Sequence, residues 1–485
     1  MEKHAVNNKT NKRKKPMKYW RLFRGVSITL IVTTIIFMLS LFRIDLLSGK
    51  YMLLLVTGIV VVEWVLLFVL NKRFKPVIKV PFMVVAVLLS GIFCFGTYNV
   101  AFAQSLVSRI VGSVIAEERY EVYVLKSKGY ESITDLNNTN FGIYDTQSES
   151  FPEAMKLLEK SVTFASKKTY EDFVLMMNDG IEGNISGFYI SSSMTEVLKE
   201  DYAELFDQYE PLADYTVKRE ENIAKSDVDV TKEPFLVYIS GIDTYGSIGT
   251  VSRSDVNILV AVNPKTQKIL FVNTPRDYYV KLHSKKAMDK LTHAGIYGVE
   301  ESMNTLGDLY ETDIDFYFKV NFSSLVKVVD TLGGITVDSK YAFSYDGHSF
   351  VRGKNNLNGA AALAFSRSRK ELPLGDISRG ENQEAVLRAL IEKATSPTII
   401  SKYISILDTL SKSFVTNMSE KDIYALAKMQ INDNPKWTIE VQNASGHDAS
   451  RTTYSAGKAL LYVMEQDEAS VNDVKQKLND ILEEN

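Results

Sequence analysis

The sequence predicts an α/β protein anchored in a membrane, and three observations carry that prediction. Three apolar stretches near the N-terminus are each about long enough to cross a bilayer core, which takes roughly 20 residues. After them, apolar runs typical of buried strands alternate with segments typical of helices. A polar stretch, Lys218–Glu233, is typical of a linker between two such α/β units. We therefore expect three parts: an anchor over residues 1–104, a smaller α/β domain over 105–226, and a larger one over 227–485.

The anchor is predicted to be multi-pass, with spans at Val26–Phe42, Tyr51–Leu70 and Pro81–Ala103. Basic residues gather in residues 1–24 and in the link 71–80, and the positive-inside rule places both in the cytoplasm. Three spans then put everything that follows outside the cell. A cleaved signal peptide is the alternative for the first span, but two further spans follow it without a cleavage-like site.

Charge and cysteine content exclude several classes of function. Residues 1–80 hold 15 Lys and Arg against 3 Asp and Glu, which leaves 41 basic and 56 acidic residues in the remainder. That split favours two compartments over a nucleic-acid-binding surface. The single cysteine, Cys94, lies in an apolar run, so an internal disulfide and a cysteine-based metal site are both excluded.

The smaller α/β domain shows no sign of chemistry of its own. We expect a helix leading off the membrane at Ser105–Glu118, followed by alternating strands and helices. The strands are predicted at Val122–Lys126, Phe141–Asp145 and Gly187–Ile190, and the helices at Phe151–Lys160, Tyr170–Asn178 and Met194–Tyr209. A glycine-rich phosphate loop and metal-ligand spacing are both missing from this sequence. A spacer or recognition module is therefore favoured over a second active site.

The larger domain begins with three predicted strands, Phe235–Ser240, Val256–Asn263 and Lys268–Asn273. Further along the chain, strands are expected at Asp315–Val320 and Ile335–Asp338, and helices at Ala287–Tyr310, Ser323–Thr331, Asn358–Phe365 and Glu381–Ala394. Gly333 and Gly334 are placed to end the second of these helices. The tail, Thr398–Asn485, is predicted to be mainly helical with one strand near Trp437–Gln442.

Charged residues stand at the ends of the first three strands of this domain and not within them. They are Asp243, Arg253, Asp255, Arg276 and Asp277. Carboxylates offer the hard oxygen ligands that Mg²⁺ takes while it keeps waters and shares substrate phosphates. Guanidinium groups match phosphate oxygens in a bidentate way and keep their charge. The grouping indicates a metal and phosphate site.

A second set of residues suits the same chemistry later in the chain. Arg367 and Arg369 are two residues apart, which puts both on one side of an extended segment. Arg379 and Gln383 are four apart, which puts both on one face of a helix start, where backbone N–H groups favour an anion. Plainer explanations exist: Arg253 and Asp255 as a surface ion pair, and the later arginines as a solvated strand end and a helix cap.

Ordered motifs in the larger domain resemble the LytR–CpsA–Psr family of Gram-positive bacteria. They cover roughly 150 residues in the right order, a more specific signal than any single motif. The matching pieces are G-I-D at 241–243, R-S-D at 253–255, P-R-D at 275–277, Lys290, V-V-D-T-L-G-G-I at 328–335, L-N-G-A-A-A-L-A-F-S-R-S-R at 357–369 and D-I-S-R-G-E-N-Q at 376–383. The three spans and the extra α/β domain resemble the capsule-locus branch found in streptococci.

The resemblance implies a mixed α/β/α sandwich with a hydrophobic tunnel for a polyprenyl tail beside its sheet. It implies a pyrophosphate held by Arg253, Lys290, Arg367, Arg369, Arg379 and Gln383. It also implies Mg²⁺ or Mn²⁺ near Asp243 and Asp255, with Arg276 acting on the phosphoryl group. Asp255 or Asp277 would serve as the general base only if neither the metal ion nor an arginine occupies it, so the identity of the base stays open. Many members have Arg where this chain has Asn382, so either the phosphate cluster is one charge weaker or Asn382 lies outside it.

The implied reaction is phosphoryl transfer at the outer face of the cell membrane. A polyprenyl-pyrophosphate-linked capsular polysaccharide is the donor, and a peptidoglycan hydroxyl is the acceptor. Other capsule-assembly proteins are possible partners. Two alternatives stay open: a membrane-bound regulator of capsule-gene transcription, and a pyrophosphatase that hydrolyses the same donor. The basic segment 1–24 is too short for a DNA-binding fold, so nucleic acid is a disfavoured partner.

Overall fold

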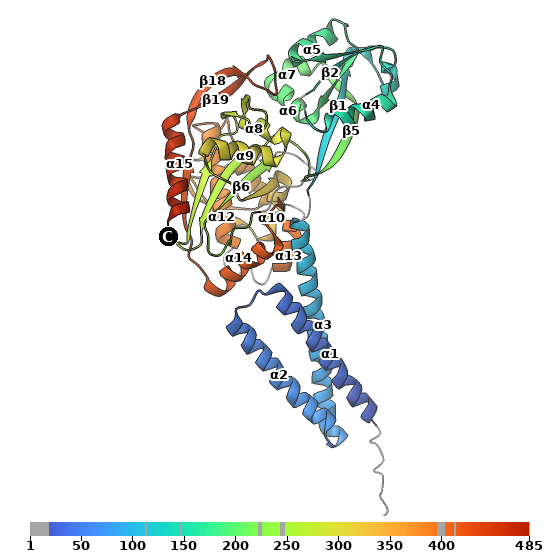
Figure 1. Cartoon of the computed structure of the whole chain (residues 1–485), viewed down its shortest axis with the longest axis vertical. Coiled ribbons are helices and arrows are strands. Elements are labelled where there is room, and N and C mark those ends of the chain that lie inside the picture. The colour runs from blue at the N-terminus through green and yellow to red at the C-terminus, as the bar shows by residue number, and fades with distance from the viewer. Residues whose placement is uncertain are drawn as a thin grey trace, which may run out of the picture. The chain divides into compact units, whose positions relative to one another are not determined.

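The computed structural model describes residues 19–111, 114–145, 148–221, 226–242, 248–394, 403–411 and 414–484. The chain forms two compact units, Met1–Gln104 and Ser105–Asn485, and each is described by itself (Figure 1).

The first unit is built from long apolar helices, α1 (Trp20–Ile44), α2 (Gly49–Asn71) and α3 (Pro76–Ile110). All three are long and apolar enough to cross a membrane, and each contains one of the predicted spans. Large apolar side chains such as Leu54, Trp64 and Phe95 are more than half exposed, which suits a lipid environment better than water. These helices fit a membrane anchor.

The second unit begins with a sheet in the order β3-β2-β4-β1-β5, which we call the five-stranded region (residues 114–221). Its strands are β1 (Val114–Leu125), β2 (Asn140–Tyr144), β3 (Ser166–Tyr170), β4 (Gly187–Ser191) and β5 (Tyr209–Glu221), and its helical segments are η1 (Lys126–Lys128), η2 (Ile133–Leu136), α4 (Phe151–Ser161), α5 (Phe173–Ile181), α6 (Ser192–Asp201) and α7 (Ala203–Phe206).

Several predictions for this region are wrong. The helix expected at Ser105–Glu118 ends at Ile110, because Val114 already pairs with β5. The helix expected at Met194–Tyr209 ends at Asp201, and Tyr209 begins β5. Strand β5 also includes residues 218–221, the first four of the predicted linker. These residues are polar, but their pairing with β1 holds them in the sheet.

A six-stranded sheet in the order β16-β11-β6-β7-β8-β17 forms the centre of the remaining chain. Its strands are β6 (Phe235–Ile242), β7 (Val256–Asn263), β8 (Lys268–Asn273), β11 (Phe316–Asn321), β16 (Phe414–Thr416) and β17 (Thr438–Asn443). The central pairs β6–β7 and β7–β8 are antiparallel, whereas β11–β6 and β17–β8 are parallel. The sheet is therefore mixed, and its three central strands are those predicted.

Helices cover both faces of this sheet. Leu236 and Tyr238 of β6 pack with α9 (Val299–Tyr310) and α15 (Glu468–Glu483). The alternate residues, Phe235 and Val237, face α11 (Gly359–Arg367), α12 (Asp376–Ala394) and α14 (Glu420–Asp433). Because successive side chains of a strand point to opposite faces, both layers are anchored by the same strands. The result is an α/β/α arrangement (Figure 1).

Shorter elements surround the sheet. They are β9 (Tyr279–Lys281), β10 (Met288–Lys290), α8 (Leu291–Ala294), η3 (Gly295–Tyr297), α10 (Phe322–Thr331), β12 (Ile335–Ser339), β13 (Phe343–Tyr345), β14 (His348–Phe350), β15 (Gly353–Leu357), α13 (Tyr403–Ser411), β18 (Gly446–Thr452) and β19 (Leu460–Gln466).

Two predictions for this part of the chain are corrected. The single helix expected at Ala287–Tyr310 is a strand, a short helix, a 3₁₀ turn and then α9. Gly298 separates the last two with φ of 107°, a conformation that breaks a helix and that glycine adopts without strain. The tail contains the helices α13, α14 and α15 and the expected strand near Trp437–Gln442 as β17, but it also contains three strands that were not expected, β16, β18 and β19.

Candidate functional site

Arg253 and Asp255 lie on a loop that enters β7, and backbone contacts hold that loop in place. The N–H of Ser254 donates to the carbonyl of Thr292 at 3.0 Å, and the N–H of Asp255 donates to the carbonyl of Gly241 at 2.8 Å. Gly295 packs directly underneath, where a Cβ would lie 2.7 Å from the carbonyl oxygen of Ser252. The close approach requires glycine, so the loop is fixed by the η3 turn.

Arg276 and Asp277 directly follow the Thr274-Pro275 pair at the end of β8. A guanidinium nitrogen of Arg276 lies 2.6 Å from Oδ1 of Asp255, and its Nε lies 3.5 Å from Oδ2 of Asp277. The Arg276 side chain is only 6% exposed. Arg276 is thus a buried arginine between the carboxylates of Asp255 and Asp277, and it connects the end of β8 to the start of β7.

Asp277 is the most enclosed charge of the site, with 1% of its side chain exposed. Lys290, at the end of β10, lies 3.3 Å from Oδ1, and Arg369 lies 3.7 Å from Oδ2. Burial alone would raise the pKa of Asp277, but the charges of Arg276, Lys290 and Arg369 outweigh it and lower the pKa to about 2. Asp277 is therefore ionised and clamps three cations.

A cavity of about 550 Å³ opens beside this cluster. Its lining includes six of the predicted residues: Arg253, Asp255, Arg276, Arg367, Arg379 and Gln383. Arg367 ends α11, and Arg379 and Gln383 lie one turn apart near the start of α12. Residues more than 100 positions apart in the sequence thus meet at one site. It presents several guanidinium groups and a helix N-terminal turn to one space, an arrangement that suits phosphate oxygens.

Asn382 is turned away from this cavity. It is 2% exposed, and its amide donates to the carbonyl of Phe365 at 3.1 Å. The amide of Gln383 donates to the carbonyl of Ser366 at 3.3 Å while its side chain lines the cavity. Of the two explanations considered for Asn382, the structure supports its place outside the phosphate cluster.

Three carboxylates at this site were missed from the sequence, and all come from α6 of the five-stranded region. Glu200 lies 2.8 Å from Arg253 and 3.5 Å from Arg369, and it also contacts Arg276. Glu196 lies 3.5 Å from Arg253, and Asp201 lies 3.9 Å from Lys290. These contacts join residues that are 53 to 169 positions apart in the sequence, so no local pattern could reveal them.

The ionisation of Glu200 follows from those neighbours. Burial alone would raise the pKa of Glu200, but the charges of Arg276 and Arg253 outweigh it and lower the pKa to about 2. Glu200 is thus a carboxylate at neutral pH, and an ionised carboxylate is an oxygen anion like a phosphate.

The predicted metal ligands are only partly within view. Asp243 lies outside the described residues, as do residues 244–247. Within the described ranges, no group of three or more His, Cys, Asp or Glu residues is arranged to hold a metal ion. Asp255 is a suitable single ligand, with 10% of its side chain exposed and one oxygen on Arg276.

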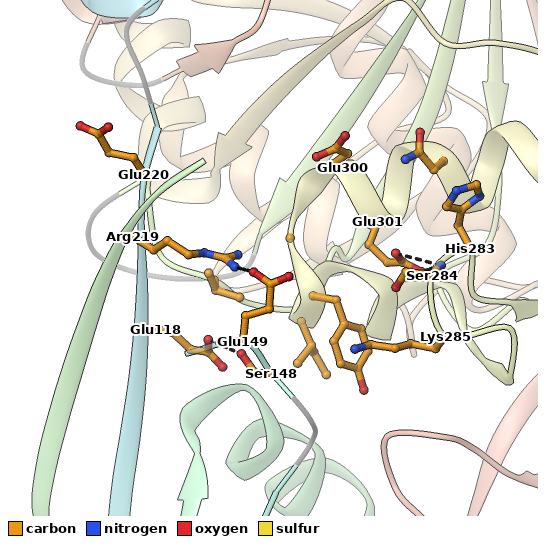
Figure 2. A pocket seen from close by; sticks show the side chains of 15 residues that line it. Glu118, Ser148, Glu149, Arg219, Glu220, His283, Ser284, Lys285, Glu300 and Glu301 are labelled. Carbon is orange, nitrogen blue, oxygen red and sulfur yellow. Dashed lines mark hydrogen bonds and ion pairs between the residues drawn. The ribbon is translucent and has the colours of Figure 1, made fainter. Parts of the chain in front are cut away.

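A second cavity, of about 410 Å³, lies between the five-stranded region and the part of the second unit that follows it, which is built on the six-stranded sheet and which we call the core. Figure 2 shows its charged lining. Arg219 points to Glu149, and Ser148 donates to Glu118 at 2.6 Å, so these contacts stay within the five-stranded region. On the other side, the N–H of Ser284 donates to the Glu301 carboxylate at 2.9 Å.

The chain belongs to the LytR_cpsA_psr family, whose family model matches residues 205–480. This confirms the resemblance drawn from the motifs. Over 255 residues the chain is 34% identical to the polyisoprenyl-teichoic acid–peptidoglycan teichoic acid transferase TagU of Bacillus subtilis, covering 52% of this chain and 79% of that relative. TagU of Enterococcus faecalis is 37% identical over 218 residues, covering 44% of this chain and 72% of that relative. The crystal structure of B. subtilis TagU matches 52% of this chain and 99% of its own at 33% identity, with a TM-score of 0.42.

Proposed function

We propose that this protein is a transferase that moves a glycopolymer from a polyprenyl-pyrophosphate carrier to peptidoglycan. The observation that carries this proposal is the cavity where Arg253, Arg276, Arg367 and Arg379 converge beside Asp255. Relatives 34% and 37% identical are named as teichoic acid transferases acting on peptidoglycan, which supports the same reaction type here. The three apolar helices support a membrane location, with the catalytic part outside the cell.

The donor's lipid tail has a suitable place beside the six-stranded sheet. On one face, Val471, Val474, Leu478 and Ile481 of α15 are buried. On the other, α14 has no buried residue, and Leu387, Ile423 and Leu426 are only partly buried although they pack against the sheet. Apolar side chains that stay partly exposed are available to contact an apolar ligand. We infer that the polyprenyl chain lies along α14 on this face of the sheet, a path that we call the seam.

In the reaction, the acceptor hydroxyl attacks the sugar-side phosphorus. The bond between that phosphorus and the bridging oxygen breaks, and polyprenyl phosphate leaves. Catalysis rests mainly on positioning and on neutralising the phosphate charges. Arg276 is placed to contact the transferred phosphoryl group, because it lines the cavity and is held by Asp255.

The hydroxyl proton needs an acceptor, and Asp255 is the better placed of the two candidates when it is not bound to the metal ion proposed below. The side chain of Asp255 is 10% exposed and lines the cavity, whereas that of Asp277 is 1% exposed and clamped by three cations. A pKa lowered to about 2 makes Asp277 a weak base. We assign Asp277 to positioning Arg276, Lys290 and Arg369.

We further propose that Mg²⁺ or Mn²⁺ is held by Asp255 together with Asp243. Two carboxylates are sufficient, since Mg²⁺ usually keeps several waters and completes its coordination with substrate phosphates. When bound, the ion would neutralise phosphate charge. The Asp243→Ala, Asp255→Ala double variant should lose metal-dependent activity, and wild-type activity that persists in chelator would rule the assignment out.

The finer proposal is that the glycopolymer is a capsular polysaccharide, since the three spans and the five-stranded region resemble the capsule-locus branch. Arg276→Ala in cells tests it. We expect wall-linked capsule and polyprenyl-pyrophosphate turnover both to fall, while capsule-operon transcription stays at its wild-type level. Unchanged linkage and turnover with altered transcription would favour a regulator instead.

A further inference from the structure

The carboxylate of Glu200 sits among the arginines that the proposed function assigns to the donor. One oxygen faces Arg253 and the other faces Arg276 and Arg369. A carboxylate that bridges several guanidinium groups uses the same donors that a phosphate group would use. Glu200 precedes the range 205–480 matched by the family model, so it is supplied by a part of the chain outside that match.

We propose that Glu200 is a built-in competitor of the donor's pyrophosphate, so that the donor binds by displacing this side chain from the arginines. This inference rests on the proposed function, because it takes the arginine-lined cavity as the phosphate site. The affinity for the donor then depends on the exchange of the Glu200 carboxylate for the donor's pyrophosphate. Because Glu200 belongs to the five-stranded region, that region influences the affinity.

The charge balance of the site explains why a competitor is accommodated. Among the described residues of the core, six cations and two acids gather here, a surplus of four positive charges. The cations are Arg253, Arg276, Lys290, Arg367, Arg369 and Arg379, and the acids are Asp255 and Asp277. Helix α6 brings Glu196, Glu200 and Asp201 together with Lys199, which halves the surplus. Its C-terminal end, where Glu200 and Asp201 lie, also carries the negative end of the helix dipole.

Displacement requires only that the Glu200 side chain rotate. Its neighbours on α6, Val197 and Leu198, are fully buried in a cluster that joins the five-stranded region to Ile296 and Leu461 of the core. The helix is therefore fixed. The Glu200 side chain itself is 34% exposed, so it has solvent to turn into when an anion of higher charge takes its arginines.

The second cavity provides a contrast. The contacts drawn in Figure 2 stay on one side or the other of that space, within the five-stranded region or within the core. At α6, by comparison, the ion pairs cross from one part to the other and end on the arginines of the site. The competing contact is thus directed at the phosphate site.

The test uses the full chain in detergent micelles, with inorganic pyrophosphate as the probe and calorimetric titration as the readout. Glu200→Gln keeps the shape of the side chain and removes its charge. We expect pyrophosphate to bind this variant roughly tenfold more tightly, which corresponds to an occupied-to-open ratio of about ten to one in the wild type. Glu204→Gln is the matched control, because it makes the same charge change on exposed residues of α7, and it should bind like the wild type.

The outcomes separate this inference from the proposed function. Equal affinity in Glu200→Gln and Glu204→Gln overturns the competitor while leaving the phosphate site in place. Weaker binding in Glu200→Gln also overturns it, because Glu200 would then be holding the arginines in their binding positions. Binding by neither variant nor the wild type rejects the phosphate site itself, and the competitor with it.

A second variant keeps the proposal testable if Glu200→Gln does not fold. Glu196→Gln loses a single 3.5 Å contact with Arg253, so it perturbs the site less. We expect pyrophosphate to bind it roughly two- to threefold more tightly than the wild type. An unchanged affinity in this variant counts against the competitor.

Discussion

Asp277 shows how a single residue organises the site. One carboxylate, almost without solvent contact, faces Arg276, Lys290 and Arg369, which come from three separate segments of the chain. A buried ion pair is costly to break because the remaining charges stay buried without compensation. Asp277 thus fixes three cations around the cavity before any substrate arrives.

The Asp277→Asn substitution should destabilise the protein at pH 7 by about 3–5 kcal/mol, because three cations lose their counter-charge. The pH dependence has a defined sign. The pKa of Asp277 in the folded protein is lowered to about 2, against about 3.9 for an unfolded chain. Its stabilisation is therefore complete above about pH 4 and is lost as pH falls towards 2.

Thermal unfolding of the full chain between pH 6 and pH 2.5 measures this effect. The wild type should lose more stability over that range than Asp277→Asn does. Asp338→Asn, a change at an exposed position, should behave like the wild type. Parallel curves for all three proteins would contradict the ion clamp.

At the scale of elements, the central strands and the site motifs are where sequence reasoning succeeds. Strands β7 and β8 have the predicted bounds, because long apolar runs between turn residues leave little ambiguity. Strand β18 was missed because its sequence is polar and mostly exposed, so it lacks a buried face to reveal it. Strand β19 was missed although Leu461, Val463 and Met464 are buried, because a short apolar run cannot be told from a buried helix segment by its pattern alone. The α6 carboxylates were missed because only the tertiary fold brings them to the arginines.

The loosely packed seam along α14 leads to a prediction about the lipid. Leu426→Trp should fill the seam and reduce transfer from a donor with a long polyprenyl chain by about tenfold, while a short-chain donor is affected little. Ile431→Trp is the control on the same helix, since Ile431 is 49% exposed. Equal losses with both donor lengths would place the lipid elsewhere.

At the scale of the whole molecule, the proposed arrangement requires the catalytic part to face the wall. Cys94 is the only cysteine in the sequence, so a Cys94→Ser background allows single cysteines to report on sidedness. A membrane-impermeant maleimide should label Asn184→Cys in intact cells, and Arg73→Cys only after permeabilisation. The reverse pattern would contradict an extracellular site.

The central claim is that the arginine-lined cavity transfers a polymer to peptidoglycan and does not simply hydrolyse its carrier. The most direct measurement reconstitutes the full chain in vesicles with a polyprenyl-pyrophosphate oligosaccharide, in the presence and absence of peptidoglycan. The account predicts that polyprenyl phosphate release depends on peptidoglycan, matches the amount of wall-linked sugar, and falls at least about 100-fold in Arg379→Ala. Release at the same rate without peptidoglycan, and no sugar linked to it, would contradict the account.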